Sequence, residues 1–182
     1  SSVTSYKANV ANSVSSLKVK PTAADSKATV TVNEEAVASG SEVSVPLNVG
    51  ENEILILVTA QDGTKKTYTL TVTRAKSSNA ELSNLAIDEG TLAPVFASSV
   101  TSYKANVANS VSSLKVKPTV ADSTATVIVN ENEVASGSEV SVPLNVGENS
   151  IEILVTAQDG TEKTYTLTVT RAKSSNADLS NL

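Results

Sequence analysis

Hydrophobic and polar residues alternate along most of this chain. Within 67–73, Tyr68, Leu70 and Val72 share one side, and threonines occupy the positions between and around them. Side chains along a β-strand point alternately to its two faces, so this pattern predicts a strand with one buried and one solvated face. Similar alternation predicts strands within 6–10, 17–21, 28–32, 43–47 and 54–58. No segment of the sequence combines helical periodicity with helix caps.

Polar segments that contain glycine or asparagine separate the predicted strands. Asp62-Gly63 lies between two alternating stretches, which is typical of a two-residue β-hairpin turn whose central residues both have positive φ. Gly160 occupies the same place later in the chain. We expect Gly160→Val to destabilise the fold, whereas Lys163→Glu on the following segment should be nearly neutral. Further turns are predicted at 38–42 and 48–52.

The chain repeats itself with a period of 97 residues, because the sequence that begins at Ser1 returns at Ser98. Two of the differences between the copies, Thr31/Ile128 and Leu55/Glu152, fall on the face opposite the predicted core. The nine differing pairs are Ala23/Val120, Lys27/Thr124, Thr31/Ile128, Glu35/Asn132, Ala36/Glu133, Glu53/Ser150, Leu55/Glu152, Lys65/Glu162 and Glu81/Asp178. The predicted core of the second copy comprises Leu114, Val116, Val127, Val129, Ile151, Ile153, Val155, Tyr165, Leu167 and Val169.

The phase of the repeat predicts the domain organisation. Residues 77–173 form a complete β-sandwich repeat, which begins with a lead segment, Ser77–Ala97. Residues 1–76 form an incomplete first repeat without a lead strand, and residues 174–182 start the next repeat. About seven short strands per repeat, with frequent turns, are the pattern of an immunoglobulin-like sandwich. The expected fold class is all-β, with tandem antiparallel β-sandwiches.

Several segments of the complete repeat together resemble one known family. They are L-S-N-L at Leu82–Leu85, G-T-L-A-P-V-F at Gly90–Phe96, V-T-S-Y at Val100–Tyr103 and A-Q-D-G-T-E-K-T-Y-T-L-T-V-T-R at Ala157–Arg171. In these motifs, and from end to end of the repeat, the chain is similar to bacterial cadherin-like β-sandwich domains. The resemblance implies a spacer or accessory domain of a secreted or surface-anchored bacterial protein. The acidic D-x-D and L-D-R-E motifs with which animal cadherins bind calcium are absent from the sequence, so calcium bridging is not implied.

The composition of the chain argues against several classes of function. The net charge is −5, and lysines and arginines do not cluster, which argues against nucleic acid and against an anionic membrane surface as partners. No apolar stretch approaches the roughly 20 residues that span a bilayer, so membrane insertion is not expected. The chain has no histidine and no cysteine, which removes the commonest general base, zinc ligands and thiol nucleophile. We therefore expect no enzyme activity, no catalytic residue and no cofactor.

Asp88 and Glu89 are the only candidates for a metal site, because they lie in the densest acidic stretch near the start of a repeat. Glu51–Glu53 or Glu131–Glu133 could add ligands. Calcium takes 6 to 8 oxygen ligands from several loops, and this spacing offers fewer. We therefore expect these carboxylates to be turn residues, with no metal bound.

Two other residue types could carry function. The four tyrosines, Tyr6, Tyr68, Tyr103 and Tyr165, could form a platform for sugars, but each is in phase with core residues, which favours packing. A lysine buried beside a carboxyl group could form an isopeptide crosslink. No lysine is assigned core parity within a strand, so this reaction is not expected.

These observations favour a structural spacer or stalk repeat at the bacterial cell surface or outside the cell. An adhesive or glycan-binding module is one alternative, and a filament subunit that donates a strand is another. In the first repeat, the groove that would receive Leu82, Leu85 and Ile87 should be open. We therefore hypothesise that Leu179 and Leu182 of one molecule dock in the first repeat of the next, so that neighbouring repeats and other copies are the expected partners.

Overall fold

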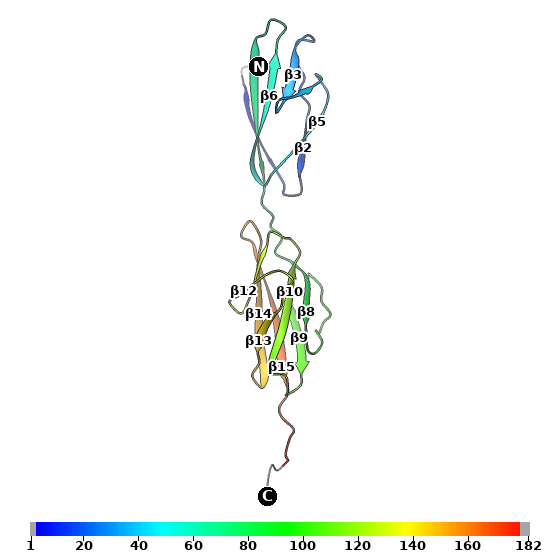
Figure 1. The fold of residues 1–182 in the computed structure, drawn as a ribbon, viewed down its shortest axis with the longest axis vertical. Coiled ribbons are helices and arrows are strands. Elements are labelled where there is room, and N and C mark those ends of the chain that lie inside the picture. The colour runs from blue at the N-terminus through cyan, green and yellow to red at the C-terminus, as the bar shows by residue number, and fades with distance from the viewer. Residues whose placement is uncertain (1–2, 179–182) are drawn as a thin grey trace. The chain divides into compact units, whose positions relative to one another are not determined.

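The structure is a computed structural model that describes residues 3–178. The chain divides into two compact units, Ser1–Lys76 and Ser77–Leu182 (Figure 1). All the regular elements among the described residues are strands, and none is a helix. This agrees with the dominance of Val and Thr in alternating positions, since branching at Cβ suits an extended backbone.

The first unit consists of two facing sheets. One contains five strands in the order β1-β7-β6-β3-β4, and the other pairs β2 with β5. The strands are β1 (Ser5–Val10), β2 (Ser16–Val19), β3 (Thr29–Val32), β4 (Glu35–Val37), β5 (Val43–Pro46), β6 (Gly50–Thr59) and β7 (Lys65–Arg74).

The second unit repeats this plan and adds one strand. Its five-stranded sheet has the order β12-β11-β14-β15-β9, and its second sheet has three strands in the order β13-β10-β8. The strands are β8 (Leu82–Ile87), β9 (Ser102–Val107), β10 (Ser113–Val120), β11 (Thr126–Val129), β12 (Asn132–Val134), β13 (Val140–Pro143), β14 (Gly147–Thr156) and β15 (Glu162–Arg171). The added strand, β8, comes from the lead segment.

The predicted fold class is confirmed, and so is the predicted core. All ten core residues listed for the second copy are at most 1% exposed. They lie on alternate positions of β10, β11, β14 and β15 and belong to one cluster with Leu82, Leu85 and Tyr103. The alternation of hydrophobic and polar residues therefore identified the inner faces of both sheets.

Two features of the sheets differ from the expectation. β9 runs parallel to β15, with Tyr103 opposite Leu167, and β1 pairs with β7 in the same way. β4 and β12 are additional strands that the alternation did not indicate, because three residues are too few to show a period of two.

The predicted hairpin at Asp159-Gly160 exists, but its turn is of another type. The amide of Gly160 donates to the carbonyl of Ala157 at 3.0 Å, and the amide of Ala157 donates to the carbonyl of Thr161 at 2.8 Å. Gly160 has a φ of 93°, whereas Asp159 is not left-handed. A type I turn followed by one left-handed residue explains this pattern. The two-residue turn was therefore wrong, but positive φ at Gly160 is confirmed.

Turns with two left-handed residues lie in the β11–β12 hairpin and in the equivalent β3–β4 hairpin of the first unit. Asn130 and Glu131 have φ of 43° and 67°. The carboxamide oxygen of Asn130 accepts a hydrogen bond from the amide of Glu152 at 2.9 Å, which fixes the turn against β14. Glutamate is unfavourable here because its Cβ crowds the backbone at positive φ.

Gly160→Val should lower the free energy of unfolding of the second unit by about 1 kcal/mol or more. No atom lies within 4 Å of a Cβ placed at Gly160, so the cost arises from the backbone conformation and not from a clash. Urea unfolding followed by tyrosine fluorescence measures the change.

Glu131→Gly provides the control with the opposite sign, because it relieves a left-handed residue with a side chain. We expect it to leave stability unchanged or to raise it by up to about 1 kcal/mol. Equal midpoints for the two variants would contradict the assignment of these turns.

Candidate functional site

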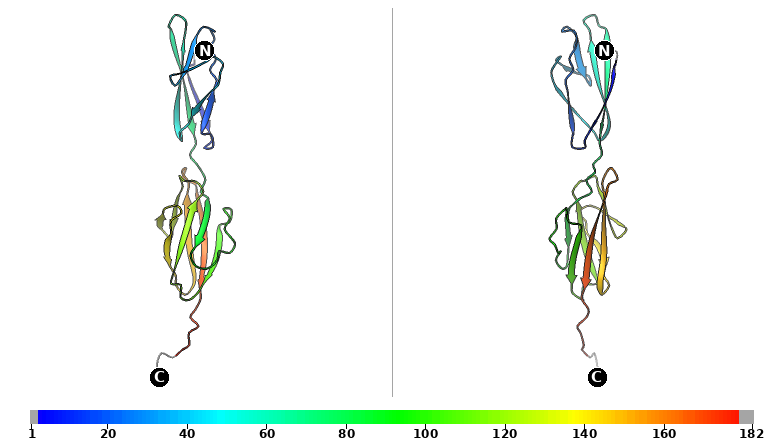
Figure 2. Two further views of the ribbon diagram at one scale, coloured as in Figure 1. Left: turned by 45° about the vertical axis from the view of Figure 1, so that its right-hand side comes forward. Right: turned by 180° about the vertical axis from the view of Figure 1, so that it is seen from behind.

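The lead segment supplies the strand that closes the second unit. β8 pairs antiparallel with β10, from Ile87 opposite Val116 to Leu82 opposite Val120 (Figure 2). Leu82 and Leu85 are buried in the core, whereas the side chains of the two residues between them are exposed. β8 therefore covers the edge of β10 and fills the space beneath it.

Polar groups fix both ends of β8. At its start, the hydroxyl of Tyr165 accepts a hydrogen bond from the amide of Leu82 at 3.0 Å. The amide of Ala121 donates to the carbonyl of Glu81 at 2.8 Å. At its end, the carboxylate of Asp88 accepts from the amide of Lys115 at 2.8 Å. The strand is thus held by side chains as well as by its ladder.

Ser77, at the start of the lead segment, is buried although it is polar. Its hydroxyl donates to the carboxylate of Asp122, and its amide donates to the side-chain oxygen of Gln158 at 3.1 Å. The hydrogen bond from Ser77 and a second one from the amide of Thr124 lower the pKa of Asp122, because both favour the charged form. The carbonyl of Ser77 accepts from the amide of Asp159 at 3.0 Å.

Lys163 forms an ion pair with the lead segment. Its ammonium group lies 3.0 Å from a carboxylate oxygen of Glu81 and donates to the carbonyl of Ser98 at 2.9 Å. It also lies 5.4 Å from the centre of the Tyr165 ring. The hydrogen bond to Glu81 raises the pKa of Lys163. Lys163 shares the parity of Tyr165, so the expectation that no lysine has core parity was wrong, and Lys163→Glu is not expected to be neutral.

The rest of the lead segment covers β9. The ring of Phe96 stacks on that of Tyr103 with centroids 6.0 Å apart, and Ala93 exchanges two backbone hydrogen bonds of 2.8 Å with Lys104. The Tyr103 hydroxyl lies 2.8 Å from the carbonyl oxygen of Ala97. A Cβ at Gly90 would lie 2.7 Å from the carbonyl oxygen of Asn106, so only glycine permits this approach.

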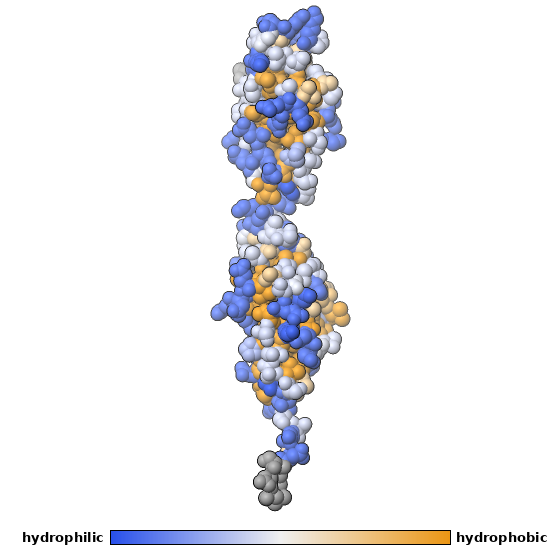
Figure 3. Space-filling view, in the orientation of Figure 1, coloured by the Kyte–Doolittle hydropathy of each residue, from blue (hydrophilic) through white to orange (hydrophobic). Residues whose placement is uncertain are grey.

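The first unit has an open groove where the second unit holds its lead segment. The groove has a volume of about 680 Å³, and apolar side chains reach the surface of this unit (Figure 3). The residues that line it are Tyr6, Lys20, Pro21, Thr22, Ala23, Ala24, Asp25, Ala28, Val30, Ile56, Val58, Ala60, Lys66, Tyr68, Thr69 and Leu70. Tyr6 is 45% exposed, whereas its counterpart Tyr103 is fully buried. The predicted open groove is therefore present.

A family model for the cadherin-like β-sandwich domain matches residues 1–75 and 82–172. The chain belongs to this family. The second cadherin-like match thus begins at Leu82, the first residue of β8, and ends one residue after β15. The resemblance seen in the sequence motifs is confirmed.

One relative and two solved structures are similar to parts or all of this cadherin-like chain. A protein of Evansella cellulosilytica named "Putative membrane protein" is 43% identical over 96 residues, which cover 52% of this chain and 14% of that protein. The structure of Drosophila N-cadherin EC1-3 is similar with a TM-score of 0.51 at 11% identity, covering 93% of this chain and 64% of the other. The fibronectin(III)-like modules of Clostridium thermocellum CbhA give a TM-score of 0.28 at 11% identity, over 100% of this chain and 97% of theirs.

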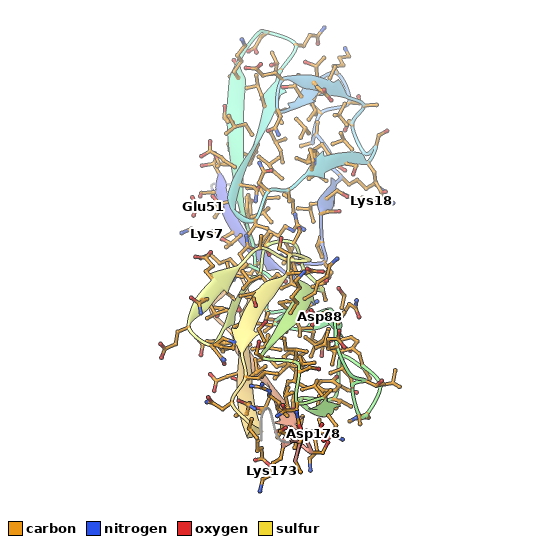
Figure 4. All side chains as sticks on the ribbon, turned by 60° about the horizontal axis from the view of Figure 1, so that its bottom comes forward. Lys7, Lys18, Glu51, Asp88, Lys173 and Asp178 are labelled. Carbon is orange, nitrogen blue, oxygen red and sulfur yellow. The ribbon has the colours of Figure 1, made fainter. Side chains whose placement is uncertain are left out.

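The candidate metal residues, Asp88 and Glu89, are exposed directly after β8, and Figure 4 labels Asp88 there. The carboxylate of Asp88 already accepts the amide of Lys115, so it ends the strand as a turn residue does. Among residues 3–178 no three acidic side chains come together as a metal site would require. Within the same range, no helix of the cadherin-like units is long and apolar enough to cross a membrane.

The other candidates separate into two groups. Tyr103 and Tyr165 are fully buried and so cannot stack on a sugar, whereas Tyr6 and Tyr68 line the groove of the first cadherin-like unit. Leu179 and Leu182, the proposed strand donors, lie outside the described residues. Sequence reasoning missed Ser77, Asp122 and Lys163. No sequence signal identifies Ser77, because its role is visible only from its burial in the structure.

Lys163→Glu should lower the free energy of unfolding of the second unit by about 1 kcal/mol, because it removes an ion pair and places a carboxylate beside Glu81. The raised pKa of Lys163 means that the pair contributes fully at neutral pH and is lost as pH rises through that pKa. Urea unfolding at pH 7 measures the effect.

Lys117→Glu, at an exposed position of β10, is the matched control and should be nearly neutral. Combining Lys163→Glu with Glu81→Lys should restore most of the loss. Failure of this charge exchange to restore stability would show that the ion pair does not hold the lead segment.

Chelation should leave the melting temperature of the chain unchanged, because the Asp88 carboxylate already accepts the amide of Lys115 and lacks converging ligands. Thermal unfolding with EDTA, with added calcium and with neither measures this. A decrease of several degrees in EDTA that calcium reverses would make Asp88 and Glu89 a binding site.

Proposed function

We propose that this chain is a structural spacer repeat of a secreted or surface-anchored bacterial protein, and that it is not an enzyme. The observation that carries the proposal is the path of the chain through the second unit. The chain enters at one end of the sandwich and leaves at the other (Figure 1). A unit whose chain ends lie at opposite ends of the sandwich can add its own length to a tandem array.

Hydrogen bonds fix the two ends of this path. Ser77 contacts the hairpin between β14 and β15 through Asp159 and Gln158. The chain leaves after Arg171, at the opposite end of β15. A strand of ten residues extends over about 30 Å, at about 3.3 Å per residue. One unit therefore separates its two ends by roughly the length of that strand.

The end at which the chain leaves is held firmly. The guanidinium group of Arg171 donates to the carbonyl of Asn109 at 2.7 and 2.9 Å and to that of Leu144 at 2.8 Å. The side chain of Asn109 in turn donates to the carbonyl of Ala172 at 2.9 Å. Arg74 makes equivalent bonds in the first unit. Charge-assisted hydrogen bonds to loops on either side keep the last strand from fraying. This suits a spacer, whose two ends must stay a fixed distance apart.

Family membership supports the cellular context. Cadherin-like β-sandwich domains are usually extracellular, and the relative in Evansella cellulosilytica bears a name that places it at a membrane. The chain spans only 14% of that relative, so the activity and partners of the larger protein are not carried over to this chain. Two nearly identical copies in sequence suit a role in which the number of units matters more than the surface of any one of them.

The test is the dependence of molecular dimensions on the number of units. Chains extended by one and by two further copies of residues 77–173 should each gain the same increment in maximum dimension, about 30 Å or more, in small-angle X-ray scattering of the monomeric fraction. Dimensions that grow only with the cube root of mass would contradict a spacer.

A glycan array with the same chains addresses the adhesive alternative. A spacer should bind no glycan. Specific binding that increases with the number of units would instead assign the repeats to an adhesive module.

A further inference from the structure

We propose that the second unit resists tension applied between the point where the chain enters it and the point where the chain leaves it. The parallel pairing of β9 with β15 is the contact that carries this tension. A spacer only has to set a distance, so resistance to force is a property beyond the proposed function. Its basis is the hydrogen bonding within the second unit alone.

The strands that would carry the tension run along the line of pull. β15 begins beside the hairpin that Ser77 contacts and ends at Arg171, where the chain leaves (Figure 1). β9 runs parallel to β15. A pull on the two ends of the unit therefore draws β15 towards the exit and draws β9, through the lead segment, towards the entry. Opposite pulls along two paired strands load their contacts in shear.

Shear loads many hydrogen bonds of this pair at once. Six residue pairs join β9 to β15. The ladder begins where the amide of Thr166 donates to the carbonyl of Thr101 at 2.8 Å, and it ends where the amide of Ala172 donates to the carbonyl of Val107 at 3.0 Å. Hydrogen bonds between parallel strands are evenly spaced, so a pull along the strands is shared among them. A pull across the end of a ladder breaks its bonds one after another.

The lead segment shields the sheared pair from water. β9 is the outermost strand of its sheet, but Ala93 exchanges two backbone hydrogen bonds of 2.8 Å with Lys104 on its outer edge. Tyr103 and Ala105 are buried on its inner face. Water therefore reaches the β9–β15 hydrogen bonds only after neighbouring groups have moved, which makes local opening of the pair unfavourable.

The entry point of the unit is tied to the start of β15. The carbonyl of Ser77 accepts from the amide of Asp159 at 3.0 Å, its amide donates to the side-chain oxygen of Gln158 at 3.1 Å, and its hydroxyl donates to the carboxylate of Asp122. A pull on Lys76 meets these hydrogen bonds first. β8 therefore stays paired with β10 until they fail.

Release of β8 would not unfold the unit. The register of the β8–β10 ladder shifts between Thr119 and Val120, near the entry, so the ladder is irregular where tension would reach it. Losing β8 lengthens the chain by the lead segment alone and leaves β9 paired with β15. Complete unfolding therefore requires the parallel pair to break.

Hydrogen bonds at the exit prevent β15 from being peeled away. The guanidinium group of Arg171 donates to the carbonyls of Asn109 and Leu144, which belong to loops on either side of the strand. The side chain of Asn109 donates to the carbonyl of Ala172 at 2.9 Å. These contacts hold the last residues of β15 in place, so tension acts along the strand and not across its end.

The first experiment compares two directions of pulling on the full chain with optical tweezers. The chain has no cysteine, so introduced cysteines define the attachment points. Lys76→Cys/Lys173→Cys loads the unit from end to end. Val146→Cys/Lys173→Cys instead pulls across the open end of the β14–β15 hairpin, where Gly147 lies opposite Arg171. All three substituted side chains are exposed.

At one loading rate, the largest unfolding step should need about twice the force or more in the end-to-end variant. The length of chain released identifies each step, and a smaller step that frees only the lead segment should precede the largest one. Urea unfolding of both variants is the control, because the two should have the same stability when no force is applied.

The second experiment compares two shortened side chains in the end-to-end variant. Ala105→Gly weakens β9 within the sheared pair, whereas Val127→Ala shortens a buried residue of β11, which does not pair with β9. Both should lower the stability in urea. At constant force, Ala105→Gly should shorten the lifetime of the folded unit about fivefold and Val127→Ala less than about twofold, because β11 is still packed when the parallel pair breaks.

Equal unfolding forces in the two pulling directions would overturn the proposal. So would equal losses of lifetime for Ala105→Gly and Val127→Ala when the two lose the same free energy in urea. The first experiment leaves β9 and its contacts unchanged, so it decides the question even if Ala105→Gly does not fold. Scattering increments from added repeats do not depend on force, so the spacer role and the resistance to tension can fail separately.

Discussion

Pairing between β8 and the edge of β10 is the interaction on which the closed sandwich depends. It brings Leu82 and Leu85 into the core, extends β10 to eight residues and lets Tyr165 bind the amide of Leu82. In the first unit, the described residues contain no counterpart of β8. Its strands keep their order and register, but one edge ends early and the side chains beneath it stay partly exposed. The five-stranded sheet thus has the same order in both units, and the two units differ in the second sheet.

Most of the fold could be predicted from the sequence because one physical rule governs most of the chain. Side chains alternate between faces, so Val127, Ile153 and Leu167 had to share the inside once any one of them did. The parallel pairing of β9 with β15 could not be predicted in this way, since alternation is the same for both directions. The left-handed Glu131 was missed because its residue type argues against the turn it occupies.

The candidate site could be located from the sequence because the lead segment, Ser77–Ala97, precedes the second copy of the repeat. Its leucines were found from the repeat itself, but its polar contacts were not. Lys163 and Asp122 read as surface charges in the sequence, and their roles arise from Glu81 and Ser77, more than 40 residues away in the chain. Tyr6 and Tyr103 lie in identical stretches, but one ring is exposed and the other is buried, because Phe96 and Ala97 of the lead segment contact Tyr103. Burial at these positions therefore depends on the lead segment as well as on the strand itself.

The two copies are nearly identical in sequence, so sequence alone does not assign a lead segment to its own unit. Residues 77–97 continue directly into β9 of their own unit, so their effective concentration at their own groove is set by a short connection. Short flexible connections give effective concentrations in the millimolar range, far above the concentration of other copies. The contacts of Gly90 and Phe96 with β9 add a second attachment within the same unit. Covalent linkage, and not sequence specificity, therefore keeps a lead segment in its own domain.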